Sequence, residues 1–211
     1  MQTSSEERER SLSRQESARE RICAAAARVI GLRGIEGTRF VDVARAAGVS
    51  IGKVQHYFPV REELLLATFD AINDASIADW DAVAHAEPDA RRRLSALLRM
   101  AAFGRPGWED IGWTVWIEFW ALSLRNPTFR EQYKILYGKW RLTLVTTLSD
   151  GVRDGDFQPR DSVKDTVDRL AGLIEGLAIR ALLDPMEMPG ERVFELLTRS
   201  VEIELDSAFP R

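Results

Sequence analysis

Residues 43–54 read VARAAGVSIGKV, and this stretch decides the predicted fold. Two short helices that cross steeply need a small residue where their backbones nearly touch, and Ala44 meets that need. Gly48 follows four residues later and can adopt the left-handed conformation that a sharp turn favours. Six residues further, Val54 can bury a branched side chain against the first helix. The spacing therefore predicts a helix-turn-helix, with Ser50 as the N-cap of its second helix.

A helix-turn-helix inserts its second helix into the major groove of DNA, so that its side chains reach the base edges. Lys53 can donate to guanine, Gln55 can bind adenine through two hydrogen bonds, and Gly52 allows the backbone to approach closely. The exposed candidates are Ile51, Gly52, Lys53, Gln55 and His56, although Ile51 also fits a half-buried slot. The candidates for phosphate binding are Thr38, Arg39, Tyr57 and Arg61. The alternative is an ordinary solvated helix face.

The charge distribution suits a protein that touches phosphate at one end only. The net charge of the 211 residues is −4, yet residues 1–61 hold eleven Arg and Lys against seven Asp and Glu. A basic segment joined to an acidic one fits partial contact with nucleic acid, although chance segregation is the alternative. The single cysteine, Cys23, excludes an intrachain disulfide framework. The N-terminus has no apolar run for a signal peptide or membrane span, so we expect a cytoplasmic protein.

Helical periodicity continues through the rest of the chain, with Pro and Gly between the periodic stretches. We expect an all-α fold of nine helices: three in a helix-turn-helix domain over residues 13–60 and six in a domain over residues 61–211. Residues 1–12 are polar, which predicts a disordered tail. Ser13 and Ser17 each precede a glutamate by three residues and are candidate capping boxes for the first helix. That helix would bury Ile22, Ala26, Val29 and Ile30.

Residues 22–66 resemble the DNA-binding pattern of the tetracycline-repressor (TetR) family. Residues 34–65, GIEGTRFVDVARAAGVSIGKVQHYFPVREELL, carry the family's Ala-Gly-Val turn and the Tyr-Phe that ends its recognition helix. Matched by position, the family's groove-reading residues are Ser50, Ile51, Gly52, Lys53, Gln55 and His56, and its phosphate-binding residues are Thr38, Tyr57 and Arg61. Gln55 stands where tyrosine is commonest, so we expect a different base preference. Val60 stands where Ser or Thr usually caps the fourth helix.

The resemblance implies a homodimeric repressor of a palindromic operator, which a small-molecule effector releases. Residues 61–211 would then be an effector-binding and dimerisation domain. This part is similar, more loosely, to the branch that contains the betaine/choline regulator. Effector binding would tilt the long fourth helix, so that the two recognition helices no longer match successive grooves.

Aromatic residues gather in the second half of the chain, where five of the six tryptophans lie between residues 108 and 140. Such rings can form a solid core or line a cavity. We interpret them as an effector pocket made by Trp80, Phe103, Trp113, Trp116, Trp120, Tyr133, Tyr137 and Trp140. With Glu118 or Glu175 nearby, a quaternary ammonium could bind by cation–π attraction. A flat apolar metabolite or an acyl chain is the alternative.

A predicted helix over residues 161–184 carries Gly172 and Gly176, whose small size permits the close approach of another helix. With the apolar face of the last helix, it predicts a four-helix interface between two copies of the chain. The expected interface residues are Leu170, Gly172, Leu173, Gly176, Leu177, Val193, Leu197 and Val201. The alternative is packing within one chain.

An enzyme is not expected, and neither is a cofactor or a metal site. The sequence has no GxSxG, HExxH or P-loop pattern, and its two histidines, His56 and His85, lie far apart. Cys23 lies on an apolar helix face, which is typical of a small buried residue. The main rival to a repressor is a helical protein–protein adaptor, which would lack salt-sensitive binding to a palindrome.

Overall fold

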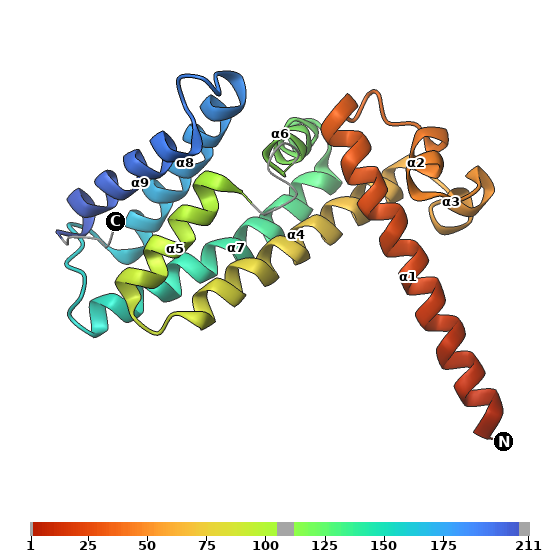
Figure 1. The fold of residues 1–211 in the computed structure, drawn as a ribbon, viewed down its shortest axis with the longest axis horizontal. Helices are drawn as coiled ribbons and strands as arrows, with labels where there is room; N and C mark the ends of the chain where they lie inside the picture. The colour runs from red at the N-terminus through yellow and green to blue at the C-terminus, as the bar shows by residue number, and fades with distance from the viewer. Residues whose placement is uncertain (1, 105–111, 207–211) are drawn as a thin grey trace. The chain divides into compact units, whose positions relative to one another are not determined.

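The protein is all-helical, as the sequence predicts. Its computed structural model describes residues 2–104 and 112–206, with side chains described from residue 17 onward. The nine helices in these ranges are α1 (Gln2–Arg33), α2 (Phe40–Ala47), α3 (Ile51–Tyr57), α4 (Arg61–Ala86), α5 (Ala90–Phe103), α6 (Gly112–Ser123), α7 (Pro127–Arg153), α8 (Val163–Leu183) and α9 (Gly190–Leu205) (Figure 1). Of these helices, none combines the length and the apolarity that a bilayer crossing requires.

Helix α1 begins at Gln2, whereas the sequence predicts a disordered tail over residues 1–12. Arg, Glu, Gln and Leu in this segment have a favourable intrinsic helix propensity, and no glycine or proline interrupts them. Ser13 and Ser17 lie inside α1, so neither forms the predicted cap at its start. The predicted buried face is confirmed, because Ile22, Ala26, Val29 and Ile30 are all buried.

The helix-turn-helix forms as its residue spacing predicts. Gly48 ends α2 in the left-handed conformation, with φ 66° and ψ 36°. Ala44 is 2% exposed and Val54 is fully buried, so the small and the branched side chain both lie in the apolar core to which α2 and α3 contribute. The hydroxyl oxygen of Ser50 accepts the backbone N–H of Lys53 at 3.2 Å, which caps α3.

The chain divides into two compact units, Met1–Asp74 and Ala75–Arg211. This division lies later than the boundary predicted at residues 60 and 61. Leu64 and Ala67, near the start of α4, belong to the apolar core that also contains residues of α1, α2 and α3. The first half of α4 is therefore part of the N-terminal unit, and its second half is part of the C-terminal unit.

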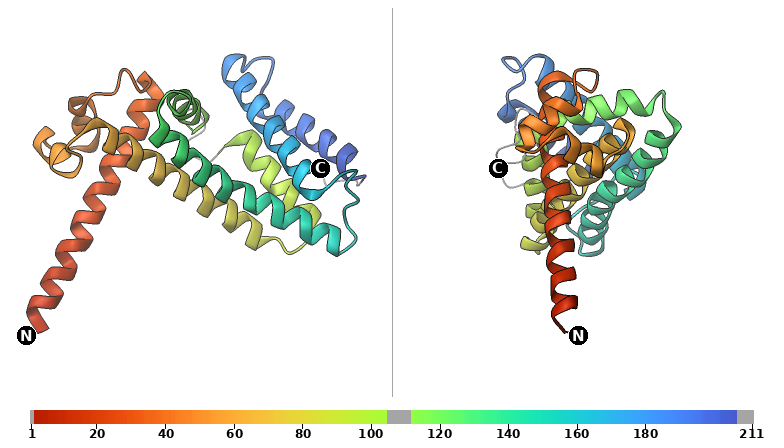
Figure 2. Two further views of the ribbon diagram at one scale, coloured as in Figure 1. Left: turned by 180° about the vertical axis from the view of Figure 1, so that it is seen from behind. Right: turned by 90° about the vertical axis from the view of Figure 1, so that its right-hand side faces the viewer.

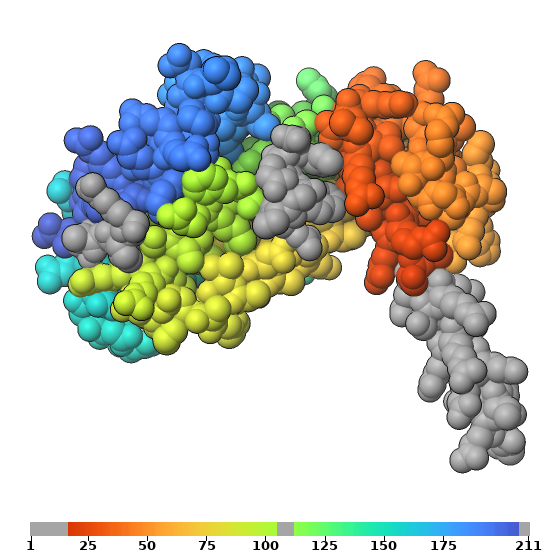
Figure 3. Space-filling view, in the orientation of Figure 1, coloured from red at the N-terminus to blue at the C-terminus, as the bar shows by residue number. Residues whose placement is uncertain are grey.

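The C-terminal unit is a bundle in which α5 packs against α7, α8 and α9. Its core is rich in leucine, including Leu94, Leu97, Leu98, Leu144, Leu148 and Leu197. α8 and α9 pack against each other and run side by side in the left view of Figure 2. Figure 3 shows atoms of both helices on one face of this unit. These two helices therefore present an outer surface as well as a face toward the core.

Candidate DNA interface and effector site

The outward face of α3 carries the side chains predicted to read bases. All six residues of this set are exposed: Ser50, Ile51, Gly52, Lys53, Gln55 and His56. Val54 is fully buried on the opposite face. Ile51 is 43% exposed and lies outside the apolar core of its unit, so it does not fill the half-buried slot that the sequence also allows. A Cβ on Gly52 would meet nothing closer than the Ser50 hydroxyl oxygen at 4.0 Å, so no contact within the chain requires glycine there.

The predicted phosphate-binding residues differ in their accessibility. Arg39 is exposed, and Tyr57 is half-buried with its ring edge-on to His56, at 5.4 Å between centroids. Thr38 requires a correction, because it is 3% exposed and its hydroxyl donates to the carbonyl oxygen of Gly34 at 2.8 Å. A buried hydroxyl that already donates its proton cannot donate it to a phosphate oxygen.

Arg61, the other predicted phosphate ligand, is engaged within the chain. Its Nε donates to the carbonyl oxygen of Thr38 at 3.3 Å, and its Nη2 donates to the carbonyl oxygen of Ile35. Both carbonyls lie between α1 and α2, so Arg61 ties the start of α4 to the segment that leads into the helix-turn-helix. The sequence does not reveal this role, since an arginine at a helix start suits phosphate binding equally well.

A row of aromatic rings joins α4 and α7 within the C-terminal unit. Trp80 of α4 meets Trp140 of α7 edge-on, with ring centroids 5.3 Å apart. Tyr137 lies 5.9 Å from Trp140, and Tyr133 stacks on Tyr137 at 5.3 Å. Trp80 is buried, whereas the other three side chains are half-buried. We call these four residues the aromatic cluster; they are half of the set predicted to form the effector pocket.

The three tryptophans of α6 are half-buried. Trp113 and Trp120 have ring centroids 6.3 Å apart, and Trp116 meets the Phe119 ring edge-on at 5.8 Å. Val115 and Phe119, which the predicted set omits, are the fully buried apolar residues of this helix. The three tryptophan side chains of α6 therefore lie beside the face of the helix that packs into the core, which leaves their rings partly accessible.

Phe103, another residue of the predicted effector set, is 36% exposed and packs against α9. Its ring lies 6.3 Å from that of Phe194, and the guanidinium of Arg99 lies over both rings. A Cβ on Gly190 would lie 2.7 Å from the Phe103 ring, so α5 and α9 approach closely here. Phe103 therefore contributes to packing between these two helices, and its predicted place in the effector site stays a prediction.

Glu175 of α8 is the acidic group beside the aromatic cluster. Burial raises the pKa of its carboxyl, which has no hydrogen-bond or ion-pair partner among the residues that the structure describes. Burial, and then the negative charge of Glu175, raise the pKa of Tyr137 to about 12 and also raise the pKa of Tyr133. Glu118, the other acidic candidate, interacts with a group of the chain. Glu175 is thus a half-buried carboxylate without a compensating charge, close to two tyrosine rings.

Cys23 is buried, as the sequence predicts, and burial raises the pKa of its thiol. A raised pKa keeps the thiol protonated, which makes it a poor nucleophile. Across residues 17–104 and 112–206, the His, Cys, Asp and Glu side chains form no group that could hold a metal ion.

Family comparisons also divide the chain into an N-terminal and a C-terminal part. Residues 22–68 match the tetR family of bacterial regulatory proteins, and residues 90–206 match the C-terminal domain of BetI-type transcriptional repressors. The chain belongs to the TetR family. It is a transcriptional regulator with a DNA-binding helix-turn-helix, which confirms the interpretation of residues 43–54. The matched families consist of regulators rather than enzymes.

Individual TetR-family relatives cover most of this chain. The regulator BetI from Escherichia coli O127:H6 is 32% identical over 74% of this chain and 78% of its own length. The regulator PksA from Bacillus subtilis is 27% identical over 89% of both chains. A transcriptional regulator from Saccharomonospora viridis, solved in complex with choline, is 28% identical with a TM-score of 0.82 and covers 90% of this chain and 98% of its own.

The eight residues predicted to form the dimer interface do not all lie on the outer face of α8 and α9 in this TetR-family chain. Five of the eight predicted residues are buried in the chain's own core: Leu170, Leu177, Val193, Leu197 and Val201. For these five, packing within the chain holds, because they lie on the inner faces of the two helices. Gly172 and Gly176 are exposed with nothing within 4 Å of an added Cβ, and Leu173 is half-buried.

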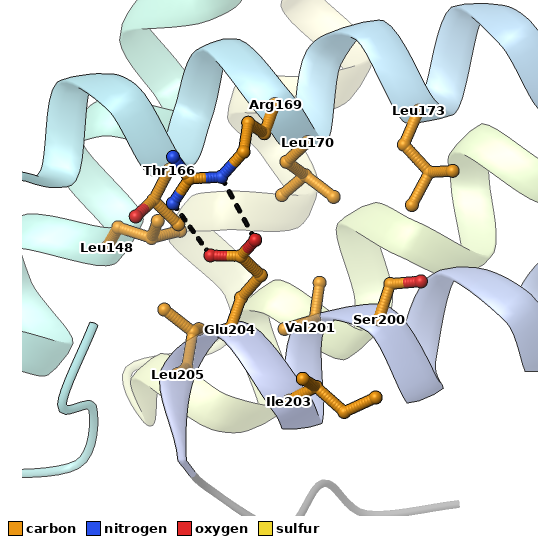
Figure 4. Close-up of a pocket in the computed structure, with 10 residues that line it drawn as sticks. All are labelled: Leu148, Thr166, Arg169, Leu170, Leu173, Ser200, Val201, Ile203, Glu204 and Leu205. Atoms are coloured by element: carbon orange, nitrogen blue, oxygen red, sulfur yellow. Dashed lines mark hydrogen bonds and ion pairs between the residues drawn. The ribbon is translucent and has the colours of Figure 1, made fainter. Parts of the chain in front are cut away.

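A groove of about 290 Å³ lies between α8 and α9 (Figure 4). Arg169 and Glu204 join the two helices there through hydrogen bonds of 2.9 and 2.7 Å. Leu173 and Ile203 line the groove, and Ile203 is 54% exposed. Among the residues that the structure describes, none forms a hydrogen bond with the buried hydroxyl oxygen of Thr166. The groove therefore combines accessible apolar side chains with an ion pair.

Proposed function

We propose that this TetR-family regulator represses transcription in the cytoplasm by binding a palindromic operator as a homodimer. The support for operator reading is the face of α3, where Lys53, Gln55 and His56 are exposed while Val54 is anchored in the core. Amide and ammonium groups on such a face can make the hydrogen bonds that distinguish base pairs in the major groove. The alternative, a helical adaptor that binds another protein, gives these side chains no specific role.

The homodimer contact that we propose is the outer face of α8 and α9. Gly172 and Gly176 leave room for a second helix to approach, and Leu173 and Ile203 offer apolar area beside them. A two-fold axis would place the same face of both copies in contact, which creates a four-helix interface. Two recognition helices would then face half-sites about one turn of DNA apart.

The effector that we propose is a small organic cation, and the main support for this proposal is Glu175. Its half-buried carboxylate has no partner in the described part of the chain, although an unpaired charge in such a place is costly. Tyr133, Tyr137 and Trp140 supply ring faces that attract a cation. A cation would therefore satisfy the carboxylate and the rings together. The choline bound to the regulator from Saccharomonospora viridis belongs to this chemical class.

Release of DNA requires that the cation bind the DNA-incompetent form more tightly than the DNA-bound form. A cation with equal affinity for both forms would bind without changing operator affinity. The coupling is reciprocal, so operator DNA should weaken cation binding by the same factor.

Choline and its neutral analogue 3,3-dimethylbutan-1-ol test this proposal, since carbon replaces the quaternary nitrogen in an otherwise matched shape. The protein first selects a duplex from a random-sequence pool, and fluorescence anisotropy then gives its affinity for that duplex. Choline should weaken operator binding by about tenfold or more, within the usual range of allosteric coupling. The neutral analogue should have a much smaller effect, because it lacks the charge that Glu175 attracts.

Equal effects of the two compounds would contradict the cationic effector. Choline binding that leaves operator affinity unchanged would contradict the release mechanism. If no sequence is enriched from the pool and binding to DNA shows no salt dependence, the adaptor alternative is favoured instead.

A further inference from the structure

Ile51 is a large apolar side chain that the fold leaves on the outer face of α3. It is 43% exposed and lies outside the apolar core of the N-terminal unit, although its neighbours Val49 and Tyr57 pack against that core. Val54 provides the buried contact of α3. The packing of the helix-turn-helix therefore gives no reason for an isoleucine at position 51.

The position of Ile51 is fixed by its neighbours. The Ser50 hydroxyl oxygen accepts the N–H of Lys53 and so defines the first turn of α3, in which Ile51 lies. An isoleucine side chain has one strongly preferred χ1 rotamer in a helix, so little conformational entropy is lost when it is held against a partner. Gly52 has no side chain that could cover it. The result is a defined apolar surface that faces away from the core.

We infer that Ile51 determines operator specificity by contacting the C5-methyl group of a thymine. In the major groove, this methyl group is the apolar feature among the donors and acceptors of the base edges. A polar base edge placed against Ile51 would lose hydrogen bonds to water, whereas a methyl group gains from burial. The inference rests on the proposed reading of the operator by α3, and it adds a residue that recognises shape and apolarity rather than hydrogen bonds.

The contact has two consequences for the choice of base. Thymine should be favoured over cytosine at this position, and 5-methylcytosine should recover part of the lost affinity because it carries a methyl group at the same ring position. A palindromic operator contains the contact once in each half-site. Loss of one buried methyl group weakens binding by about fourfold, so loss of both should weaken it by about 16-fold.

A deoxyuridine scan tests the inference on a duplex that the wild-type protein selects from a random-sequence pool. Deoxyuridine removes the C5-methyl group of thymine and leaves every hydrogen-bonding group in place. For the wild-type protein, one symmetry-related pair of thymines should show the loss of about 16-fold. For Ile51→Ala, the same replacement should have almost no effect, because the apolar partner of the methyl group has been removed.

Val41→Ala is the matched control, because Val41 is an apolar residue of α2 in the same unit and is 40% exposed. This variant should keep the full sensitivity to deoxyuridine. The inference is overturned if the wild-type protein tolerates deoxyuridine at every position, or if Ile51→Ala keeps the wild-type sensitivity. If the wild-type protein enriches no sequence from the pool, operator binding itself fails, and the inference fails with it. The wild-type scan also stands alone if the Ile51→Ala variant does not fold.

Discussion

Replacing Glu175 with glutamine removes the charge beside the aromatic cluster and preserves the size of the side chain. Glu175 has no ion-pair partner within the described residues, and its negative charge contributes to the raised pKa values of Tyr133 and Tyr137. The substitution should therefore change the binding of a cation far more than it changes packing. Binding of the neutral analogue 3,3-dimethylbutan-1-ol should be almost unaffected, because the ring contacts remain.

The size of the effect follows from the charges and the burial. A carboxylate and a quaternary ammonium about 4 Å apart attract each other by about 4 kcal/mol at an effective dielectric constant of about 20. Part of this attraction is offset, because both charges lose contact with water when they meet. A net contribution of about 2 kcal/mol corresponds to about thirtyfold weaker choline binding by the Glu175→Gln variant.

The pH dependence of choline binding gives a second signature. Burial raises the pKa of the Glu175 carboxyl, so this group becomes protonated at a higher pH than an ordinary glutamate does. Only the deprotonated form of Glu175 carries the negative charge that attracts a cation. Choline affinity of the wild-type protein should therefore fall as the pH is lowered through this raised pKa, while the affinity of Glu175→Gln stays constant.

The same raised pKa makes folding stability depend on pH in the opposite direction to choline affinity. The folded state favours the protonated carboxyl, so the stability linked to this group is complete below its ordinary pKa of 4.5. That stability is lost as the pH rises through the folded-state pKa. Glu175→Gln should therefore unfold at a higher temperature than the wild-type protein at neutral pH.

Isothermal titration calorimetry between about pH 5 and pH 8 measures the choline affinities of the wild-type protein and of Glu175→Gln directly. Glu191→Gln is the matched control, because Glu191 is an exposed carboxylate in the first turn of α9. The control should bind choline as the wild-type protein does at every pH. The reasoning is refuted if Glu175→Gln binds choline as tightly as the wild-type protein, or if both proteins lose affinity in parallel as the pH falls.

Three further predictions concern the turn, the start of α4 and the outer face of α8. Gly48→Ala should destabilise the N-terminal unit by about 1–2 kcal/mol in thermal unfolding, because alanine is strained at φ 66°, and an unchanged melting temperature would argue against this. Arg61→Ala should leave the slope of log affinity for operator DNA against log salt concentration unchanged, since Arg61 bonds to carbonyl oxygens. Arg39→Ala should reduce that slope by about 2, because a homodimer loses one phosphate contact in each half-site, and equal slopes for the two variants would contradict their different roles. Gly176→Glu should give a stable monomer in sedimentation, because the helix accepts glutamate but a second copy would not. Gly138→Glu on α7, at an equally open glycine, should remain dimeric, and a dimeric Gly176→Glu would disprove the proposed interface.

The helix-turn-helix was predictable because its geometry accepts few residue types at three places. Ala44 lies where two backbones cross, Gly48 has a positive φ, and Val54 is fully buried. Each requirement is local and can be read from the residue itself together with its spacing. The order and type of the remaining helices followed from helical periodicity and from the Pro and Gly residues between the periodic stretches.

The sequence could not decide which apolar residues face the core and which face a partner. Leu170 and Leu173 lie on one helix three residues apart and both line the groove, yet Leu170 is buried whereas Leu173 is half-buried. Both positions fit an amphipathic pattern, and only the arrangement of neighbouring helices distinguishes them. Thr38 shows the same limit for polar groups, because its hydroxyl has a partner, Gly34, that the sequence does not identify.

Operator affinity of the double variant Lys53→Ala, Gln55→Ala tests the reading of DNA by α3 most directly. Both side chains are exposed, so the variant should fold like the wild-type protein. A well-placed side chain contributes about 1–3 kcal/mol of discrimination between bases, so the double variant should lose about 100-fold or more in affinity for the selected duplex. Its weak binding to unrelated DNA should change much less. Affinity for the selected duplex within error of the wild-type value would show that another surface of the protein reads the operator.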